Sequence, residues 1–316
     1  MAGEKPDVLM VGARKPVMMK GFEGKVNLHH WLELKDKDAF VKESGGKIRA
    51  IAIAYTANKV DENFLKQFPK LEQVSSFGVG YDHIDAKWAG AQGITVTNTP
   101  DVLNEEVADT AIGLLLCTVR EFPQSERFLR AGKWPQGHYP LTKATLRDRT
   151  VGMVGMGRIG KAIARRLEAF GVPVVYHSRN PQSGVTYKYY PKLIDMARDV
   201  DTLMVIVPGG ASTQNMINAE VLKALGPRGV VVNMARGSVV DEAALVRALK
   251  EKRLGGAGLD VFEHEPQVPA ELMALDNAVL VPHIGSATIE TRAAMAQRVF
   301  DNLASFFKNG KLISQA

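Results

Sequence analysis

Val151-Gly-Met-Val-Gly-Met-Gly-Arg-Ile-Gly160 is the stretch that decides the fold, because an apolar run leads directly into a Gly-x-Gly-x-x-Gly turn. Gly155 permits a tight turn out of a strand, Gly157 lets the backbone approach a pyrophosphate, and Gly160 lets the following helix pack closely on that strand. The free N–H groups and the positive dipole end of such a helix attract phosphate. Three glycines alone could mark only a turn, but apolar residues recur after them at the four-residue spacing that predicts a helix: Ile159, Ile163 and Leu167.

The residues after the next predicted strand, 172–176, indicate which dinucleotide is bound. An Asp or Glu at this point would bind the ribose 2′-hydroxyl and repel a 2′-phosphate, whereas this chain reads Ser178-Arg179-Asn180. A guanidinium can hold a phosphate with two hydrogen bonds or stack on adenine. We therefore expect a preference for NADP(H), with NAD(H) as the alternative cofactor, and Lys188 is near enough in sequence to assist. The alternative interpretation is that Arg179 is a solvated loop residue with no role in cofactor binding.

The composition is that of an ordinary globular protein, with 46% hydrophobic and 23% charged residues. The net charge of +6 comes without a basic block interleaved with aromatics, so an anionic cofactor and substrate explain it more simply than nucleic acid. The single cysteine, Cys117, excludes an internal disulfide and a multi-cysteine metal site, and the apolar run around it, 111–119, predicts a core position. That run is too short to cross a bilayer, and the N-terminus lacks the apolar core of a signal peptide. We expect a cytoplasmic protein with no metal and no membrane contact.

Strand-like and helix-like segments alternate along the chain, which predicts an α/β protein. Asn98-Thr-Pro-Asp101 is a turn cluster and a candidate crossing between two domains, since 316 residues exceed the usual size of one domain. Helices are expected at about 105–120 and 286–308, and the second could return to the first domain. The predicted strands cover 7–12, 48–55, 71–77 and 94–97, then, beyond the glycine turn, 172–176, 203–207, 230–234, 257–261 and 279–281.

Polar residues follow three of these strands: Arg236 after 230–234, Glu265 after 257–261 and His283 after 279–281. Open parallel sheets bind ligands beyond the carboxyl ends of their strands, so the three side chains can meet in one cleft. There Arg236 can clamp a substrate carboxylate and polarise its keto oxygen, and His283 can donate a proton to the forming alkoxide. Glu265 can orient the imidazole and favour its charged form. Each residue alone has a structural interpretation, but together they favour reduction of a 2-oxo acid by hydride from a nicotinamide.

Four motifs in this order resemble the D-isomer-specific 2-hydroxyacid dehydrogenase family over essentially the whole chain: Gly155–Gly160, Asn233–Gly237, Gly258–Phe262 with Glu265-Pro266, and Pro282–Ser286. The likeness is nearest to its glyoxylate/hydroxypyruvate and hydroxyphenylpyruvate reductases. The resemblance implies a Rossmann-type doubly wound parallel sheet inserted in a discontinuous, flavodoxin-like α/β substrate domain. It assigns 1–99 and 286–316 to the substrate-binding domain and 100–285 to the NADP-binding domain, and it implies a homodimer.

The same resemblance implies further site residues. The backbone of 77–81 would hold the substrate carboxylate, which makes Val79 and Gly80 substrate residues alongside Arg236 and His283. Trp134 resembles a loop tryptophan that borders the pocket of the partner subunit in relatives, with ordinary loop packing as the alternative. Asp260 would receive the nicotinamide carboxamide. The expected cofactor-binding residues are Gly155, Gly157, Arg158, Ile159, Gly160, Ser178, Arg179, Val207, Pro208, Thr213, Met234, Ala235, Asp260, His283 and Gly285.

The sequence therefore predicts an NADPH-dependent reductase that converts glyoxylate, hydroxypyruvate or a related 2-oxo acid to the D-2-hydroxy acid. Relatives acting on phosphorylated acids tend to carry a basic residue near the end of the second N-terminal strand, where this chain reads Ala54-Tyr-Thr-Ala-Asn58. The missing charge disfavours phosphoglycerate, but Lys59 directly after this segment keeps phosphoglycerate as an alternative substrate. A formate or phosphonate oxidoreductase on the same scaffold and a dinucleotide-sensing, corepressor-like binding protein are the alternatives. The candidates for shaping the side-chain pocket are Tyr55, His138 and Tyr139.

Overall fold

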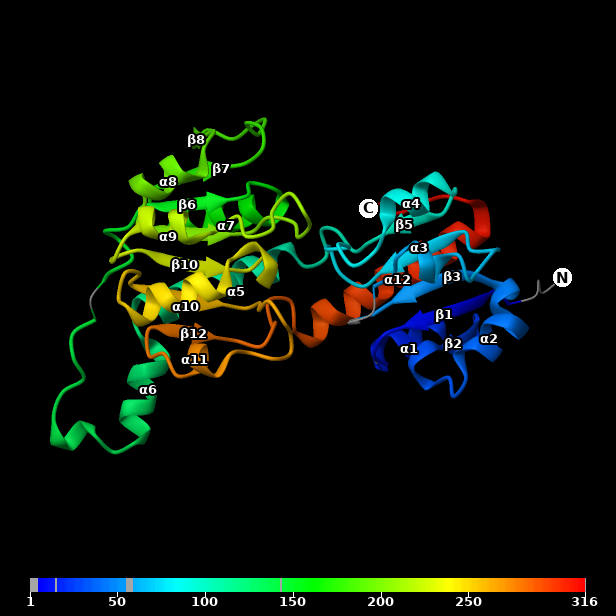
Figure 1. Ribbon diagram of the computed structural model, residues 1–316, viewed down its shortest axis with the longest axis horizontal. Helices are drawn as coiled ribbons and strands as arrows, with labels where there is room; N and C mark the ends of the chain where they lie inside the picture. Colours follow the sequence, from blue (N-terminus) through cyan, green and yellow to red (C-terminus); the bar gives the residue numbers. More distant parts are fainter. Residues whose placement is uncertain (1–4, 15, 55–58, 143, 316) are drawn as a thin grey trace. The chain divides into compact units, whose positions relative to one another are not determined.

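Apolar strands alternate with helices throughout the computed structural model, which describes residues 5–14, 16–54, 59–142 and 144–315. The strands form one sheet of five and one sheet of seven, and neighbouring strands pair in parallel. Each sheet belongs to its own compact unit (Figure 1): unit 1 comprises Met1–Leu103 and Thr288–Ala316, and unit 2 comprises Asn104–Ala287. The α/β class predicted from the sequence is confirmed.

The sheet of unit 1 has the order β2-β1-β3-β4-β5, which is the flavodoxin-like order. Its strands are β1 Asp7–Val11, β2 Asn27–His30, β3 Ile48–Ile53, β4 Gln73–Ser76 and β5 Thr95–Thr97. Strand β2 was not predicted, because Asn-Leu-His-His is an incompletely buried edge strand without the apolar run that marks its neighbours.

Helices cover both faces of this sheet. On one face α12 contacts α1 and packs on β4, and on the other α2, α3 and α4 share a hydrophobic core with β1 and β3. In that core Trp31, Phe64 and Phe68 pack edge to face, with ring centroids 5.1–6.3 Å apart. The α- and 3-10 helices of unit 1 are α1 Pro16–Phe22, η1 Trp31–Glu33, α2 Lys37–Ser44, η2 Gly45–Lys47, α3 Glu62–Leu65, α4 Ala86–Ala91 and α12 Ile289–Asn309.

The sheet of unit 2 has the order β12-β11-β10-β9-β6-β7-β8. The chain enters at β6, builds outward to β8 and returns to β9 on the other side of β6. This reversal is the topological switch point of a doubly wound sheet, where the loops diverge at the carboxyl ends of the strands and open a ligand crevice. The strands are β6 Val151–Val154, β7 Val174–His177, β8 Lys188–Tyr190, β9 Thr202–Val205, β10 Val230–Asn233, β11 Gly256–Leu259 and β12 Ala278–Leu280.

Figure 1 shows helices on both faces of this sheet as well, with α8, α9 and α10 on the near face and α5 and α7 behind it. Arg166 of α7 pairs with Asp109 of α5, with Nε and Oδ1 2.6 Å apart. Cys117 of α5, expected in the core, is only partly buried, and this burial raises its pKa. No helix within the described ranges is long and apolar enough to span a bilayer. The helices of unit 2 are α5 Asn104–Val119, α6 Phe122–Arg130, η3 Trp134–Gln136, α7 Arg158–Ala169, α8 Leu193–Asp199, α9 Ala219–Leu225, η4 Gly237–Val239, α10 Glu242–Lys250 and α11 Ala270–Met273.

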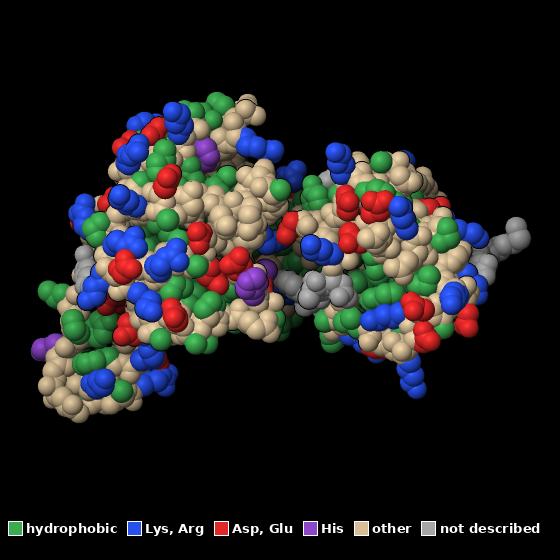
Figure 2. All heavy atoms as spheres, in the orientation of Figure 1, with side chains coloured by type: hydrophobic (Ala, Val, Ile, Leu, Met, Phe, Trp, Pro, Cys, Tyr) green, Lys and Arg blue, Asp and Glu red, His purple; other side chains and the backbone are tan. Residues whose placement is uncertain are grey.

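One part of unit 2, here called the arm (residues 120–142), extends away from its sheet (Figure 1). The arm carries α6 and η3 and then runs without regular structure. Figure 2 shows hydrophobic side chains on this region among lysines and arginines. Large apolar side chains of the arm that remain exposed are Phe122, Leu129, Trp134 and Leu141.

Candidate active site

The predicted glycine turn joins β6 to α7. Gly155 has φ +105°, and a Cβ there would lie 2.6 Å from the Ile206 carbonyl oxygen. A Cβ at Gly160 would lie 2.5 Å from the Gly155 oxygen, so α7 can pack on the turn only with glycine at both positions. Gly157 is exposed at the N-cap of α7 with nothing within 4 Å of its Cβ position, which leaves the helix N-terminus open to a pyrophosphate. The first turn of α7 holds the other two residues expected here, Arg158 and Ile159.

Hydrogen bonds to two of its own backbone oxygens hold the segment after β7. Ser178 Oγ donates to Asn180 O at 2.7 Å, and Tyr189 OH of β8 donates to Ser178 O at 3.1 Å. Arg179 lies between them and is exposed, and residues 177–180 contain no Asp or Glu. The end of β7 therefore presents a cation where other dinucleotide folds present an acid, which suits a 2′-phosphate.

Lys188, the residue expected to assist, is positioned for a different contact. It lies on β8 opposite Val175, before the carboxyl end of β7. Its Nζ donates to Tyr190 OH at 2.6 Å and lies 3.9 Å from Asp199 Oδ2. The charge of Lys188 is engaged there, so the structure does not assign it to the turn at 178–180.

Arg236 follows β10 in a loop that Asn233 holds in place. Asn233 is buried, its Nδ2 donates to Arg236 O at 2.9 Å, and its Oδ1 accepts from Ala235 N at 3.0 Å. Gly237 packs directly on the segment after β11, because a Cβ at Gly237 would lie 1.9 Å from the carbonyl carbon of Phe262. Only glycine allows this approach, which brings the loops after β10 and β11 into contact.

Glu265 and His283 form a pair at the centre of the candidate site. Glu265 Oε2 lies 2.7 Å from His283 Nδ1, and Glu265 Oε1 accepts from Phe262 N at 3.0 Å. Burial raises the pKa of Glu265, but the hydrogen bond and charge of His283, the Phe262 N–H and the Arg236 charge outweigh it, so this pKa lies below its ordinary value. An ionised carboxylate only accepts, so His283 Nδ1 carries the shared proton. The structure thus brings together the three side chains that the sequence predicted at separate strand ends.

Asp260, which follows β11, anchors the loop of His283. Its Oδ1 accepts from Ile284 N at 2.6 Å, its Oδ2 accepts from Gly285 N at 3.0 Å, and its backbone oxygen accepts from His283 N at 2.9 Å. These bonds hold His283 at φ +52°, a region that non-glycine residues rarely adopt. Burial raises the pKa of Asp260, and the hydrogen bonds from Ile284 and Gly285 offset this only in part. The family resemblance implied a nicotinamide contact for Asp260, whereas this anchoring role was not predicted.

The remaining expected cofactor residues lie beyond β9 and β10, at the same edge of the sheet as the glycine turn. After β9, Thr213 is buried and its Oγ1 donates to Pro208 O at 2.7 Å, while Val207 is partly buried. After β10, Met234 and Ala235 are both buried.

In unit 1 the loop after β4 presents two consecutive N–H groups. Gly78 O accepts from Thr99 N and Val79 O accepts from Asn98 Nδ2, both at 2.9 Å. Because a trans peptide points its C=O and the next N–H in opposite directions, the N–H groups of Val79 and Gly80 both face away from 98–99. Neither N–H donates a hydrogen bond within the described ranges of the chain. Adjacent N–H groups on one side form an anion-binding nest, which suits a carboxylate.

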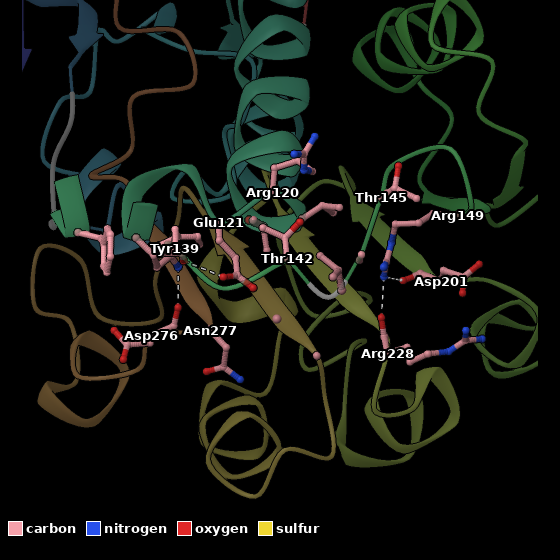
Figure 3. Close-up of a pocket in the computed structure, with 18 of the residues that line it drawn as sticks. Arg120, Glu121, Tyr139, Thr142, Thr145, Arg149, Asp201, Arg228, Asp276 and Asn277 are labelled. Carbon is pink, nitrogen blue, oxygen red and sulfur yellow. Dashed lines mark hydrogen bonds between the residues drawn. The ribbon is translucent and has the colours of Figure 1, made fainter. Parts of the chain in front are cut away.

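A cavity of about 1040 Å³ lies at the opposite end of the unit 2 sheet, where the arm meets the amino ends of the strands (Figure 3). Buried Arg149 crosses this end, donating to Thr202 Oγ1 at 2.9 Å and to the Arg228 carbonyl at 2.7 Å. Because parallel sheets bind ligands at their carboxyl ends, this cavity is separate from the candidate active site.

Of the pocket residues considered from sequence, the structure describes His138 and Tyr139, and it places both on the arm. Tyr139 lines the amino-end cavity, where its OH donates to Glu121 Oε2 at 2.8 Å (Figure 3). Burial and this hydrogen bond raise the pKa of Tyr139 to about 12. His138 is exposed on the arm, and Tyr55 falls outside the described residues, as does most of 54–58. Trp134 is 60% exposed, so most of this large apolar side chain is not covered by its own chain.

Sequence reasoning missed the residues that support these loops, Asn233, Gly237 and Asn98. Asn233 and Gly237 stand in the quoted motif Asn233–Gly237, and Asn98 stands in the quoted turn cluster, but residue type alone did not show what each would contact. Among the described residues, no His, Cys, Asp and Glu side chains gather in a group that could hold a metal ion.

Comparison with known proteins finds relatives over nearly the whole chain. Residues 112–285 match the model of the D-isomer specific 2-hydroxyacid dehydrogenase NAD binding domain. Glyoxylate/hydroxypyruvate reductase A of Arabidopsis thaliana is 44% identical over 98% of this chain and 99% of its own, and hydroxyphenylpyruvate reductase of Plectranthus scutellarioides is 44% identical over 90% of each. An NADPH-dependent glyoxylate/hydroxypyruvate reductase of Sinorhizobium meliloti, solved with NADP and malonate, is 49% identical with a TM-score of 0.93 over 99% of this chain and 97% of its own.

Proposed function

Since this chain belongs to the family of D-isomer-specific 2-hydroxyacid dehydrogenases, we propose that it reduces a small 2-oxo acid such as glyoxylate or hydroxypyruvate to the D-2-hydroxy acid with NADPH. The observation that carries the proposal is the Glu265–His283 pair, 2.7 Å apart and close enough to Arg236 for its charge to lower the Glu265 pKa. Two relatives of this chain are named glyoxylate/hydroxypyruvate reductase and hydroxyphenylpyruvate reductase, which supports the substrate class.

Proton delivery falls to His283. Glu265 holds the imidazole through Nδ1, so Nε2 is the ring nitrogen that donates to the keto oxygen as it becomes an alkoxide. The charged imidazolium is stabilised by the ionised Glu265 until that proton leaves. Arg236 supplies the complementary positive charge, binding the substrate carboxylate and polarising the carbonyl.

The residues that would hold NADPH fit a phosphorylated dinucleotide. The open N-terminus of α7 at Gly157 suits the pyrophosphate, and Ser178 with Arg179 suits the 2′-phosphate. Asp260 would accept from the carboxamide with lone pairs not used by Ile284 and Gly285. The reduced nicotinamide, when bound, supplies the hydride.

The test is a kinetic panel of glyoxylate, hydroxypyruvate, pyruvate and aromatic 2-oxo acids with NADPH and NADH, followed by loss of reduced-cofactor absorbance. We expect His283→Ala to lose almost all turnover, about 10²-fold or more, while NADPH binding is largely retained. His264→Ala is the matched control, because His264 is an exposed neighbour of Glu265 outside the pair, and it should turn over normally. Absence of turnover by the wild-type protein across the whole panel would refute the proposed function.

We further propose that the protein is a homodimer whose contact includes the arm. Exposed apolar side chains on the arm and the cavity beneath it support this, since a second copy can cover both. Trp134 would then serve the partner's pocket, as the family resemblance implies. Analytical ultracentrifugation tests this: Trp134→Asp with Leu129→Asp should shift the wild-type dimer to monomer, and a wild-type monomer at micromolar concentration would refute it.

We also propose the functional division of the chain into a substrate domain, 1–99 with 286–316, and an NADP-binding domain, 100–285. The glycine turn in unit 2 and the N–H nest in unit 1 support it. A cytoplasmic location is proposed as well, because a single cysteine offers no stabilising disulfide and suits a reducing compartment. Cell fractionation with an antibody to the chain would test the location.

A further inference from the structure

We propose that Asn98, itself held by the C-terminal segment, is the positioning residue that aims the Gly80 N–H at the substrate carboxylate. The inference rests on the proposed function, because it concerns the same carboxylate. On this proposal Ser314 and Asn302 affect substrate affinity. Both lie more than two hundred positions after Asn98 in the chain.

The first step is the contact between Asn98 and the nest. Asn98 Nδ2 donates to Val79 O at 2.9 Å, and the planar peptide fixes the Gly80 N–H in the opposite direction. Rotation of the Val79–Gly80 peptide changes ψ of Val79 and φ of Gly80, and Gly80 allows this change because it has no Cβ. The Asn98 amide is therefore what keeps this peptide in one orientation.

The second step is the amide itself. Asn98 Oδ1 is buried and has no hydrogen-bond partner in the described part of the chain. An unpaired buried carbonyl oxygen is unfavourable, and an apolar side chain of the same size would avoid it. The Nδ2 donor is therefore the feature of Asn98 that an apolar side chain could not replace. It donates to the Val79 oxygen.

The third step is the support of Asn98 by the C-terminal segment. The backbone oxygen of Asn98 accepts from Asn302 Nδ2 of α12 at 3.1 Å and from Ser314 Oγ at 2.7 Å. Asn302 Oδ1 accepts in turn from Ser314 N at 3.2 Å. All three residues are at most 9% exposed, so water does not replace these bonds easily. The chain of contacts runs from Ser314 through Asn98 to the peptide that presents the Gly80 N–H.

The test compares Asn98→Leu, which keeps the size but removes the donor, with Ser314→Ala and the matched control Gln315→Ala, an exposed neighbour. We expect the KM for glyoxylate to rise about tenfold in Asn98→Leu and about threefold in Ser314→Ala. In both variants kcat and the KM for NADPH should stay within about twofold of wild type, and Gln315→Ala should match wild type throughout. A merely structural role would lower the active fraction and leave the KM for glyoxylate unchanged.

A second readout is independent of turnover. Hydrogen exchange of peptides covering 77–81 should be faster in Ser314→Ala than in Gln315→Ala, with exchange in β1 unchanged. If wild-type enzyme turns over but Ser314→Ala keeps both its KM and its exchange rate, the inference is wrong and the proposed function stands. If no 2-oxo acid is turned over, the proposed function fails, and the exchange comparison alone decides whether Asn98 and Ser314 hold this loop.

Discussion

Replacing Gly237 with alanine should separate the two loops that carry Arg236 and Glu265. The new Cβ would lie 1.9 Å from the Phe262 carbonyl carbon and 2.3 Å from Glu263 N, where ordinary contact begins at 3.4 Å. The obstacles are backbone atoms, so the loops themselves must move apart by roughly 1.5 Å. Misplacement of a catalytic group by about 1 Å lowers the rate about 10²-fold, and overpacking of this kind costs about 1–3 kcal/mol of stability.

The assay is kcat/KM for the best 2-oxo acid, measured with thermal unfolding and NADPH binding. We expect Gly237→Ala to lose about 10²-fold in kcat/KM while the folded protein still binds NADPH, because the glycine turn at α7 does not share the altered contact. Gly90→Ala is the control, since its Cβ position has nothing within 4 Å. Wild-type kcat/KM and an unchanged Tm in Gly237→Ala would refute the packing argument.

Two further predictions concern charge. Arg179→Asp should shift the ratio of kcat/KM for NADPH over NADH at least about tenfold toward NADH, because a charge-assisted contact to the 2′-phosphate becomes a repulsion; an unchanged ratio would remove Arg179 from the cofactor site. The pKa of Glu265 is lowered in the folded protein, so its stabilisation is present above its unfolded pKa, about 4.3, and is lost as pH falls through the folded value. The Tm difference between wild type and Glu265→Gln should therefore be full near neutral pH, begin to shrink as pH falls below about 4.3, and disappear once pH is below the lowered folded pKa; a difference that stays constant as the solution is acidified would show that the carboxylate charge is not its source.

A part of the fold could be predicted where its backbone conformation or its burial restricts which residue types can occur. The turn at Gly155–Gly160 was predictable because only glycine meets the close approaches found there. The buried strands were predictable from apolar runs, whereas β2 and β8 were missed because they are short edge strands with polar or aromatic residues. Apolar runs do not specify the register between strands. The ion pair between Lys188 and Asp199 therefore could not be predicted.

The sequence predicted the Arg, Glu and His side chains of the candidate site. It did not predict the residues that hold their loops in place. Arg, Glu and His at strand ends have recognisable chemistry, so their types and order were informative. Asn233 and Asn98 act through hydrogen bonds to backbone oxygens, and any asparagine in a turn can make such bonds. Their partners are set by tertiary contacts, which the sequence pattern does not specify.

The supports also explain why the reacting groups keep one geometry. Asp260 fixes the backbone on both sides of Ile284, Glu265 is fixed through Phe262 N, and the two loops meet at a position that accepts only glycine. All of these contacts lie within unit 2. The N–H nest lies in unit 1, where Asn98 and the C-terminal segment hold it. Substrate affinity and proton transfer should therefore respond to different substitutions, which is why a rise in KM without loss of kcat distinguishes the Ser314 network from the Glu265–His283 pair.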